Sequence, residues 1–269
     1  MIKKILKFIY RNLRDTYLIY QFPREGGYSY FRGVFENFEQ AIASAPKSKS
    51  IGYNNAALAE EYCNSKTQLE TIRDYDYPML FWLQSIFTEQ KSDNISILDF
   101  GGNVGIHFYA YKKYLHYPEN LKWTVLDVPE IVKFGKNLSQ ANPSPKLDFT
   151  ESIEHISGKD VFMASGSIQY VEDLSVLLKP LLKKPSHLLL NRIPLSETGQ
   201  FVTLQNGGKV FYAQYVFNRF NFIESLQEIG YDLIDLWEDK LDRCIIPFHP
   251  KKSIHFYHGM YLKLRDETL

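Results

Sequence analysis

The apolar positions of this chain follow two different patterns. Residues 2–13 place isoleucine and leucine at helical spacing, and most of the region from 31 to 87 also follows a helical pattern. From residue 95 onward, short apolar runs alternate with helical stretches. Such alternation is typical of an α/β fold in which helices cover both faces of a mostly parallel sheet. We therefore predict a doubly wound, Rossmann-like sheet preceded by a helical N-terminal extension.

Seven of the runs are candidate strands of this sheet, and the last two would form a terminal pair. They are residues 95–100, 121–127, 146–150, 160–165, 187–193, 231–237 and 258–264. A further signal, Asn206 followed by two glycines, separates two short alternating runs and predicts a β-hairpin. We divide the chain into a helical extension or cap over 1–90 and a sheet domain over 91–269, with the hairpin inserted around 199–215. The hairpin is either a lid over a pocket or a peripheral element.

A glycine-rich turn follows the first run and is the most informative segment. Glycine adopts positive φ and lets a ligand approach the main chain, which predicts a site for a nucleotide-like ligand. Asp99 ends the strand, where it would repel a pyrophosphate and hold a cationic group. Phe100 occupies the place of the first glycine in a dinucleotide fingerprint ending at Gly105. The turn therefore does not match a nicotinamide site.

A second acid, Asp127, ends the next predicted strand. A carboxylate at the carboxyl end of the second strand of a doubly wound sheet can accept hydrogen bonds from both ribose hydroxyls. Together, Asp99 and Asp127 favour an adenosine that carries positive charge.

At these residues the chain resembles the class I S-adenosylmethionine-dependent methyltransferases. Their first motif, an acid followed by alternating glycines, corresponds to residues 99–105, with Asn103 in place of the middle glycine. Asparagine tolerates positive φ better than other non-glycine residues. Residues 127–132 resemble the segment that follows the second strand in small-molecule O-methyltransferases.

More narrowly, most of the chain resembles a family of bacterial methyltransferases associated with surface-polysaccharide gene clusters, such as those for lipopolysaccharide O-antigen. The segments that carry this resemblance are 35–41, 52–53, 98–105, 165–170, 191–194 and 230–231. The resemblance implies S-adenosyl-L-methionine as cofactor and the sugar of a surface-glycan precursor as acceptor.

The same resemblance implies a set of site residues. The expected cofactor-binding residues are Asp99, Gly101, Gly102, Asn103, Gly105, Asp127, Val128, Glu151, Ser152, Ser165 and Gly166. Tyr170, Gln169 and His107 are the catalytic candidates, since the loop after the fourth strand faces the transferred methyl group and His107 follows the turn. Tyr53, Arg73 and Arg192 are the candidates for acceptor binding, although Arg192 could instead pair with a structural acid.

The composition limits the classes of partner and metal that we expect this protein to bind. Lysine and arginine balance aspartate and glutamate at 31 each, so no global field attracts nucleic acid, and we expect none as partner. The two cysteines, Cys63 and Cys244, are too few for a disulfide framework and fit a reducing cytoplasm. The sequence shows no acid or histidine cluster with metal-ligand spacing, so we invoke no metal.

Residues 1–15 combine an apolar helical stripe with five basic residues. The segment is too interrupted by charge to be a signal peptide or a membrane span. It either contacts the inner face of a membrane peripherally or packs its stripe on the domain.

The leading hypothesis is a cytoplasmic S-adenosylmethionine-dependent O-methyltransferase. The alternatives are a methyltransferase-like binding subunit without activity and, less favoured by Asp99 and Phe100, a nucleotide-dependent oxidoreductase or epimerase.

Overall fold

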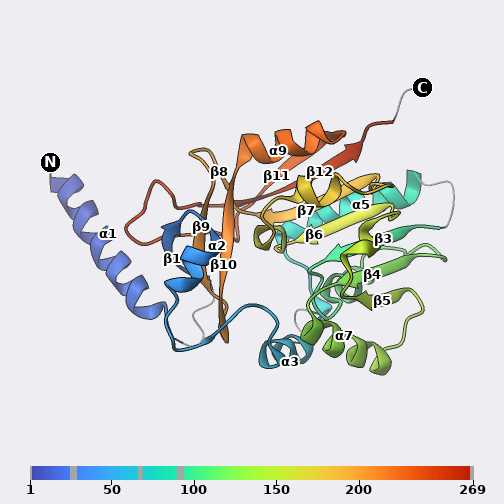
Figure 1. Ribbon diagram of the computed structural model, residues 1–269, viewed down its shortest axis with the longest axis horizontal. Coiled ribbons are helices and arrows are strands. Elements are labelled where there is room, and N and C mark those ends of the chain that lie inside the picture. Colours follow the sequence, from blue (N-terminus) through green and yellow to red (C-terminus); the bar gives the residue numbers. More distant parts are fainter. Residues whose placement is uncertain (1, 25–28, 66–68, 90–93, 267–269) are drawn as a thin grey trace.

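The computed structural model describes residues 2–24, 29–65, 69–89 and 94–266, and it contains two sheets (Figure 1). The larger sheet has seven strands in the order β11-β12-β7-β6-β3-β4-β5. Their bounds are Tyr231–Asp239, Tyr257–Leu264, His187–Ile193, Val161–Ser165, Ser96–Phe100, Lys122–Leu126 and Leu147–Thr150 in that order. β3 to β7 are parallel, and β12 is antiparallel to both of its neighbours. The predicted α/β fold with a terminal strand pair is confirmed.

Helices cover both faces of this sheet, as the doubly wound prediction requires. On one face, α5 and α6 bury Leu83 and Phe108 against Trp123 of β4. On the other, α8 and α9 bury Leu178 and Leu226 against strand residues of the same sheet. The helices along this part of the chain are α5 (Tyr77–Glu89), α6 (Ile106–Tyr111), α7 (Pro129–Ala141), α8 (Leu174–Leu178) and α9 (Arg219–Glu228), with short 3-10 turns η1 (Asp74–Asp76), η2 (Ile153–Ile156) and η3 (Ile168–Tyr170).

The smaller sheet stands across the carboxyl ends of the larger one. Where the sequence predicts a hairpin, β9 (Phe201–Asn206) pairs antiparallel with β10 (Val210–Asn218). β1 (Tyr30–Phe35) joins β9, while β2 (Ser50–Ile51) and β8 (Leu195–Ser196) join β10. Two strands from residues 1–90 thus belong to the hairpin's sheet, in addition to the helices that the sequence predicts for this part of the chain. Residues 1–90 also supply α2 (Phe38–Ala43) and α3 (Ala56–Asn64).

The first helix, α1 (Ile2–Gln21), extends away from the rest of the molecule (Figure 1). Contacts at its carboxyl end anchor it: the Asp15 carboxylate accepts a hydrogen bond from the Phe248 backbone at 2.9 Å. Just beyond the helix, Phe22 stacks on Phe211 of β10. In the described residues, no helix combines the length and apolar character needed to cross a bilayer. The apolar stripe of α1 is exposed, so the alternative in which it packs on the domain is wrong.

Candidate functional site

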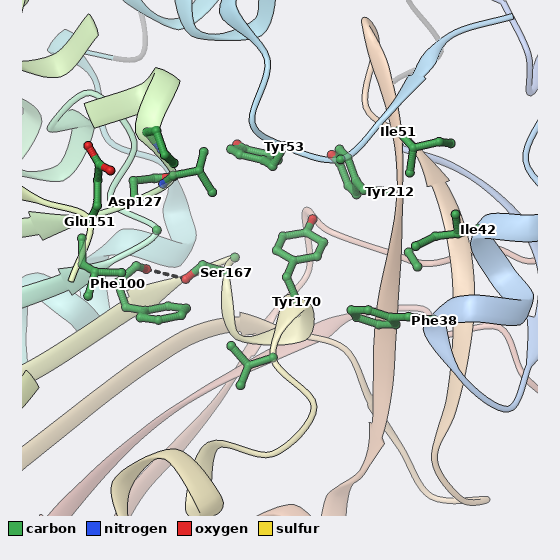
Figure 2. A pocket seen from close by; sticks show the side chains of 18 residues that line it. Phe38, Ile42, Ile51, Tyr53, Phe100, Asp127, Glu151, Ser167, Tyr170 and Tyr212 are labelled. Carbon is green, nitrogen blue, oxygen red and sulfur yellow. Dashed lines mark hydrogen bonds between the residues drawn. The ribbon is translucent and has the colours of Figure 1, made fainter. Parts of the chain in front are cut away.

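A cavity of about 570 Å³ lies between the carboxyl ends of the parallel strands and the smaller sheet (Figure 2). Its sheet side is lined by Phe100, Gly101, Leu126, Asp127, Val128, Pro129, Glu151, Gly166, Ser167, Tyr170 and Val171. The opposite side is lined by Phe38, Ile42, Ile51, Gly52, Tyr53, Tyr212 and Ala213. The first group follows β3, β4, β5 and β6, which is where ligands bind in open α/β sheets.

The glycine turn has the backbone that its sequence predicts. Gly101, Asn103 and Gly105 have positive φ angles of 65°, 59° and 91°, so Asn103 takes the left-handed conformation in place of a glycine. A Cβ on Gly101 would lie 2.4 Å from the Cβ of Ser167. A Cβ on Gly102 would lie 2.4 Å from the Asp99 carboxyl carbon. A side chain at 101 is therefore excluded by close packing and by backbone conformation, and one at 102 by close packing.

The N–H groups of this turn are already used inside the protein. The Asn103 N–H donates to the Asp127 carboxylate at 2.9 Å, and the Val104 N–H donates to the Asn103 side chain at 2.8 Å. The other N–H groups between 101 and 106 donate to backbone carbonyls within or next to the turn. A phosphate binds at such turns by accepting hydrogen bonds from free N–H groups. Here the backbone offers none from residue 101 to 106.

Asp127 lines the cavity and is 8% exposed. One carboxylate oxygen accepts from the Val128 N–H at 2.8 Å and the other from Asn103. Burial raises the pKa of Asp127 to about 7, against the lowering effect of these two hydrogen bonds. A carboxylate has about four lone-pair sites, so each oxygen retains one for a ligand hydroxyl.

Asp99 does not reach the cavity, contrary to its predicted contact with the cofactor. Successive strand residues point to opposite faces, and because Phe100 lines the cavity, Asp99 faces the α6 side. The Asp99 carboxylate is fully buried, lies 3.0 Å from His107 Nδ1 and accepts from Trp123 Nε1 at 3.2 Å. The Asp99 side chain thus packs beneath the glycine turn, on the side away from the cavity.

His107 is bound to that same carboxylate and is not among the residues that line the cavity. Burial alone would lower the pKa of His107, but the charge and the hydrogen bond of Asp99, together with the charge of Asp76, outweigh it and raise the pKa. The imidazole is thus engaged on the far side of the strand tip. The structure does not place it as a general base for a ligand in the cavity.

Three tyrosines meet where the two sides of the cavity approach each other (Figure 2). The Tyr170 ring lies 5.2 Å from Tyr212 and 6.2 Å from Tyr53, measured between centroids. The Tyr53 hydroxyl is 2.7 Å from that of Tyr62. Burial raises the pKa of Tyr212 to about 12 and that of Tyr53 and Tyr170 well above the ordinary value. These hydroxyls therefore remain protonated at neutral pH.

Of the other expected cofactor residues, Gly101, Val128, Glu151 and Gly166 line the cavity. Ser152 instead caps η2, accepting from the Glu154 N–H at 3.3 Å. Ser165 is buried and accepts a hydrogen bond of 3.4 Å from Asn191. Gly102, Asn103 and Gly105 shape the turn without lining the cavity.

The catalytic candidate Gln169 is also set back from the cavity. It is 4% exposed, and its amide nitrogen donates to the Gly166 carbonyl at 3.1 Å. Tyr170, the next residue, is the member of this pair that lines the cavity.

The two arginines expected at the acceptor lie elsewhere. Arg192 donates to Asp242 at 2.5 Å and stacks over Tyr75, so the structure shows the pairing with an acid. Arg73 is exposed and is the N-cap residue of η1, where its N–H donates to Asp76 at 2.8 Å. Neither guanidinium lines the cavity, whereas Tyr53 does.

Most residues on the side of the cavity formed by the smaller sheet and α2 were not predicted from the sequence. Phe38, Ile42, Ile51 and Tyr212 line it, and none was a candidate. The only local signal was the alternation on the hairpin strand, which places Tyr212 and Gln214 on one face and Ala213 on the other. That alternation could not show which face meets a ligand.

No family model matches the sequence, and the search of curated proteins finds no relative. Several solved structures are similar at low identity. The 1,6-didemethyltoxoflavin-N1-methyltransferase of Burkholderia thailandensis, with S-adenosylhomocysteine bound, is 14% identical with a TM-score of 0.48, covering 78% of this chain and 84% of its own. An S-adenosylmethionine-dependent methyltransferase of Aquifex aeolicus is 13% identical with a TM-score of 0.48. The match covers 78% of this chain and 99% of that one. The N-terminal domain of EvdMO1, in the presence of SAH and D-fucose, is 11% identical with a TM-score of 0.49. The match covers 72% of this chain and 84% of that one. At these levels of similarity, function has to be inferred from the cavity itself.

Proposed function

We propose that this protein is an S-adenosylmethionine-dependent methyltransferase. The observation that carries the proposal is the charge of a nucleoside-sized cavity. Among the residues that the structure describes, its lining includes two carboxylates, Asp127 and Glu151, and no lysine, arginine or histidine. The adjoining turn has no free N–H between 101 and 106. These features disfavour a pyrophosphate and favour an adenosine whose tail is cationic.

Each part of such a cofactor has suitable residues. Asp127 would accept the ribose hydroxyls, and Phe100, Leu126 and Val128 offer an apolar surface for adenine. Gly101 and Gly166 carry no side chain and line the cavity close to Tyr170. The bound cofactor supplies an activated methyl group on a sulfonium.

The acceptor would bind between the tyrosines and the smaller sheet. Tyr53, Tyr170 and Tyr212 offer aromatic faces and neutral hydroxyls, which suit the alternating apolar and hydroxyl surface of a sugar ring. We propose a sugar hydroxyl of a bacterial surface-glycan precursor as the methylated group, and this assignment rests on the family resemblance. Holding that hydroxyl in line with the methyl carbon supplies much of the rate enhancement.

A second candidate function is that of a binding subunit without activity. It is favoured by the placement of the histidines: in the part of the chain that the structure describes, none lines the cavity, and His107 is bound to Asp99. Among the described residues of the lining, only Asp127 and Glu151 could accept a proton from an alcohol.

Methyl transfer distinguishes these two functions. The purified chain would be incubated with methyl-labelled S-adenosylmethionine and a panel of nucleotide sugars and lipid-linked glycans. Label in a glycan product supports the enzyme. Cofactor binding without label in any of these acceptors would favour the binding subunit.

A further inference from the structure

We propose that α1 is a membrane-binding element that lies in the surface of an anionic bilayer. Its apolar side chains are uncovered over most of its length. Ile2, Leu6 and Leu13 are 73%, 60% and 67% exposed, and Ile9 is 48% exposed. At 100° per residue these four side chains fall on one face of the helix.

This face points away from the rest of the protein. Asp15 is 1% exposed and holds α1 to the loop at Phe248, so its side of the helix is the docked side. The helical angle between Asp15 and Leu13 is roughly 160°, which places the apolar face on the opposite side. Figure 1 shows the amino-terminal turns of α1 standing clear of both sheets. In the described residues, therefore, the apolar face has no covering partner within the chain.

The charges of α1 indicate which partner covers its apolar face. Its sequence carries five basic residues and a single acid, Asp15. Asp15 is buried and paired with Arg14 at 2.6 Å, so its charge does not offset the exposed cations Lys3 and Lys7. A second copy of α1 would bring the same positive charge against this one, which opposes a helix pair. An anionic lipid surface is complementary to the cations and accepts the apolar face.

An interfacial helix of this kind needs both contributions. Apolar burial draws the stripe into the boundary between headgroups and acyl chains, while each basic residue adds about 1 kcal/mol near an anionic surface. Removing one lysine charge should then weaken binding roughly fivefold. The proposal does not depend on the methyltransferase assignment, because its readout is lipid binding.

The test is co-sedimentation of the full chain with vesicles of phosphatidylglycerol and, separately, of phosphatidylcholine. We expect binding to the anionic vesicles, little binding to the neutral ones, and weakening by added salt. The double variant Lys3→Glu/Lys7→Glu should lose at least 25-fold in affinity, which is two successive fivefold steps. Its matched control, Lys179→Glu/Lys183→Glu, changes two exposed lysines outside α1 and should bind like wild type.

The apolar contribution has its own pair of variants. Leu6→Glu/Ile9→Glu should abolish sedimentation, whereas Leu182→Glu/Phe220→Glu, which changes exposed apolar residues elsewhere, should preserve it. Because all four side chains are exposed, both variants should melt like wild type, and thermal unfolding checks this.

Two results would overturn the proposal. One is equal sedimentation with and without the α1 substitutions. The other is a wild-type dimer, seen by light scattering, that Leu6→Glu/Ile9→Glu dissociates while no vesicle is bound. The second result would identify another copy of the chain as the occupant.

Discussion

At the residue scale, Asp127 is the side chain on which we expect cofactor binding to depend most. It is the carboxylate at the tip of β4, and its remaining lone pairs are available to ribose hydroxyls. A hydrogen bond to a charged group contributes about 1.5–3 kcal/mol, so Asp127→Asn should weaken S-adenosylhomocysteine binding roughly 10- to 100-fold. Titration calorimetry of both proteins measures this. An unchanged affinity would remove Asp127 from the ribose site.

The same residue predicts a pH dependence of stability. Folding raises the pKa of Asp127 from 3.8 to about 7, mainly because burial disfavours the charged form. An acid with a raised folded-state pKa contributes stability that is complete below the unfolded pKa and is lost as pH rises to the folded one. Between about pH 4 and pH 7, wild type should therefore lose up to about 4 kcal/mol of unfolding free energy relative to Asp127→Asn. Urea unfolding of the free proteins across this interval measures the difference, and parallel curves would contradict it.

We expect Tyr170 to serve the acceptor rather than the cofactor. Its ring contacts Tyr53 and Tyr212, which come from the opposite wall. Replacing Tyr170 with alanine should reduce turnover at least tenfold, because the acceptor loses its alignment, while S-adenosylhomocysteine affinity changes less. Kinetics and calorimetry on one preparation give both numbers. A normal turnover rate would exclude Tyr170 from the acceptor site.

At the element scale, the smaller sheet depends on a buried asparagine at the hairpin. The Asn206 amide nitrogen donates to the carbonyls of Phe22 and Arg24 at 2.7 and 2.9 Å, and its oxygen accepts from Lys49 and Gly208. These bonds tie the chain after α1, the segment before β2 and the hairpin together.

Asn206→Ala should lower the unfolding free energy by about 2–4 kcal/mol, because buried carbonyls lose their donor. Asn221→Ala, at an exposed position in the first turn of α9, is the control and should change it by less than about 0.5 kcal/mol. Chemical denaturation compares the three proteins. Equal losses in both variants would show that the bonds of Asn206 do not hold this sheet together.

At the scale of the whole molecule, local patterns were sufficient for the larger sheet. Each of its strands is an apolar run bounded by turn residues, so all seven could be predicted from the sequence. β1 could not, because its six residues form a strand only through pairing with β9, about 170 positions later. Such pairing leaves no local periodicity to detect.

The residues of the candidate site also divide into those that local sequence predicts and those that it does not. The turn at 101–105 and Asp127 could be located because their conformations follow from residue type and position. The direction of Asp99 was missed, since strand alternation gives two faces without saying which one holds the ligand. The wall formed by the smaller sheet and α2 was missed because Phe38, Ile51 and Tyr212 are brought together only by tertiary packing.

The central claim is that the cavity accepts an adenosine with a cationic tail and rejects one with a pyrophosphate. Isothermal titration of the purified chain with S-adenosylhomocysteine and, in parallel, with NAD⁺ tests it most directly. The homocysteine compound shares the adenosine and the amino acid end of the cofactor. We predict micromolar binding of S-adenosylhomocysteine and none of NAD⁺. Binding of NAD⁺ alone, or of neither compound, would contradict it.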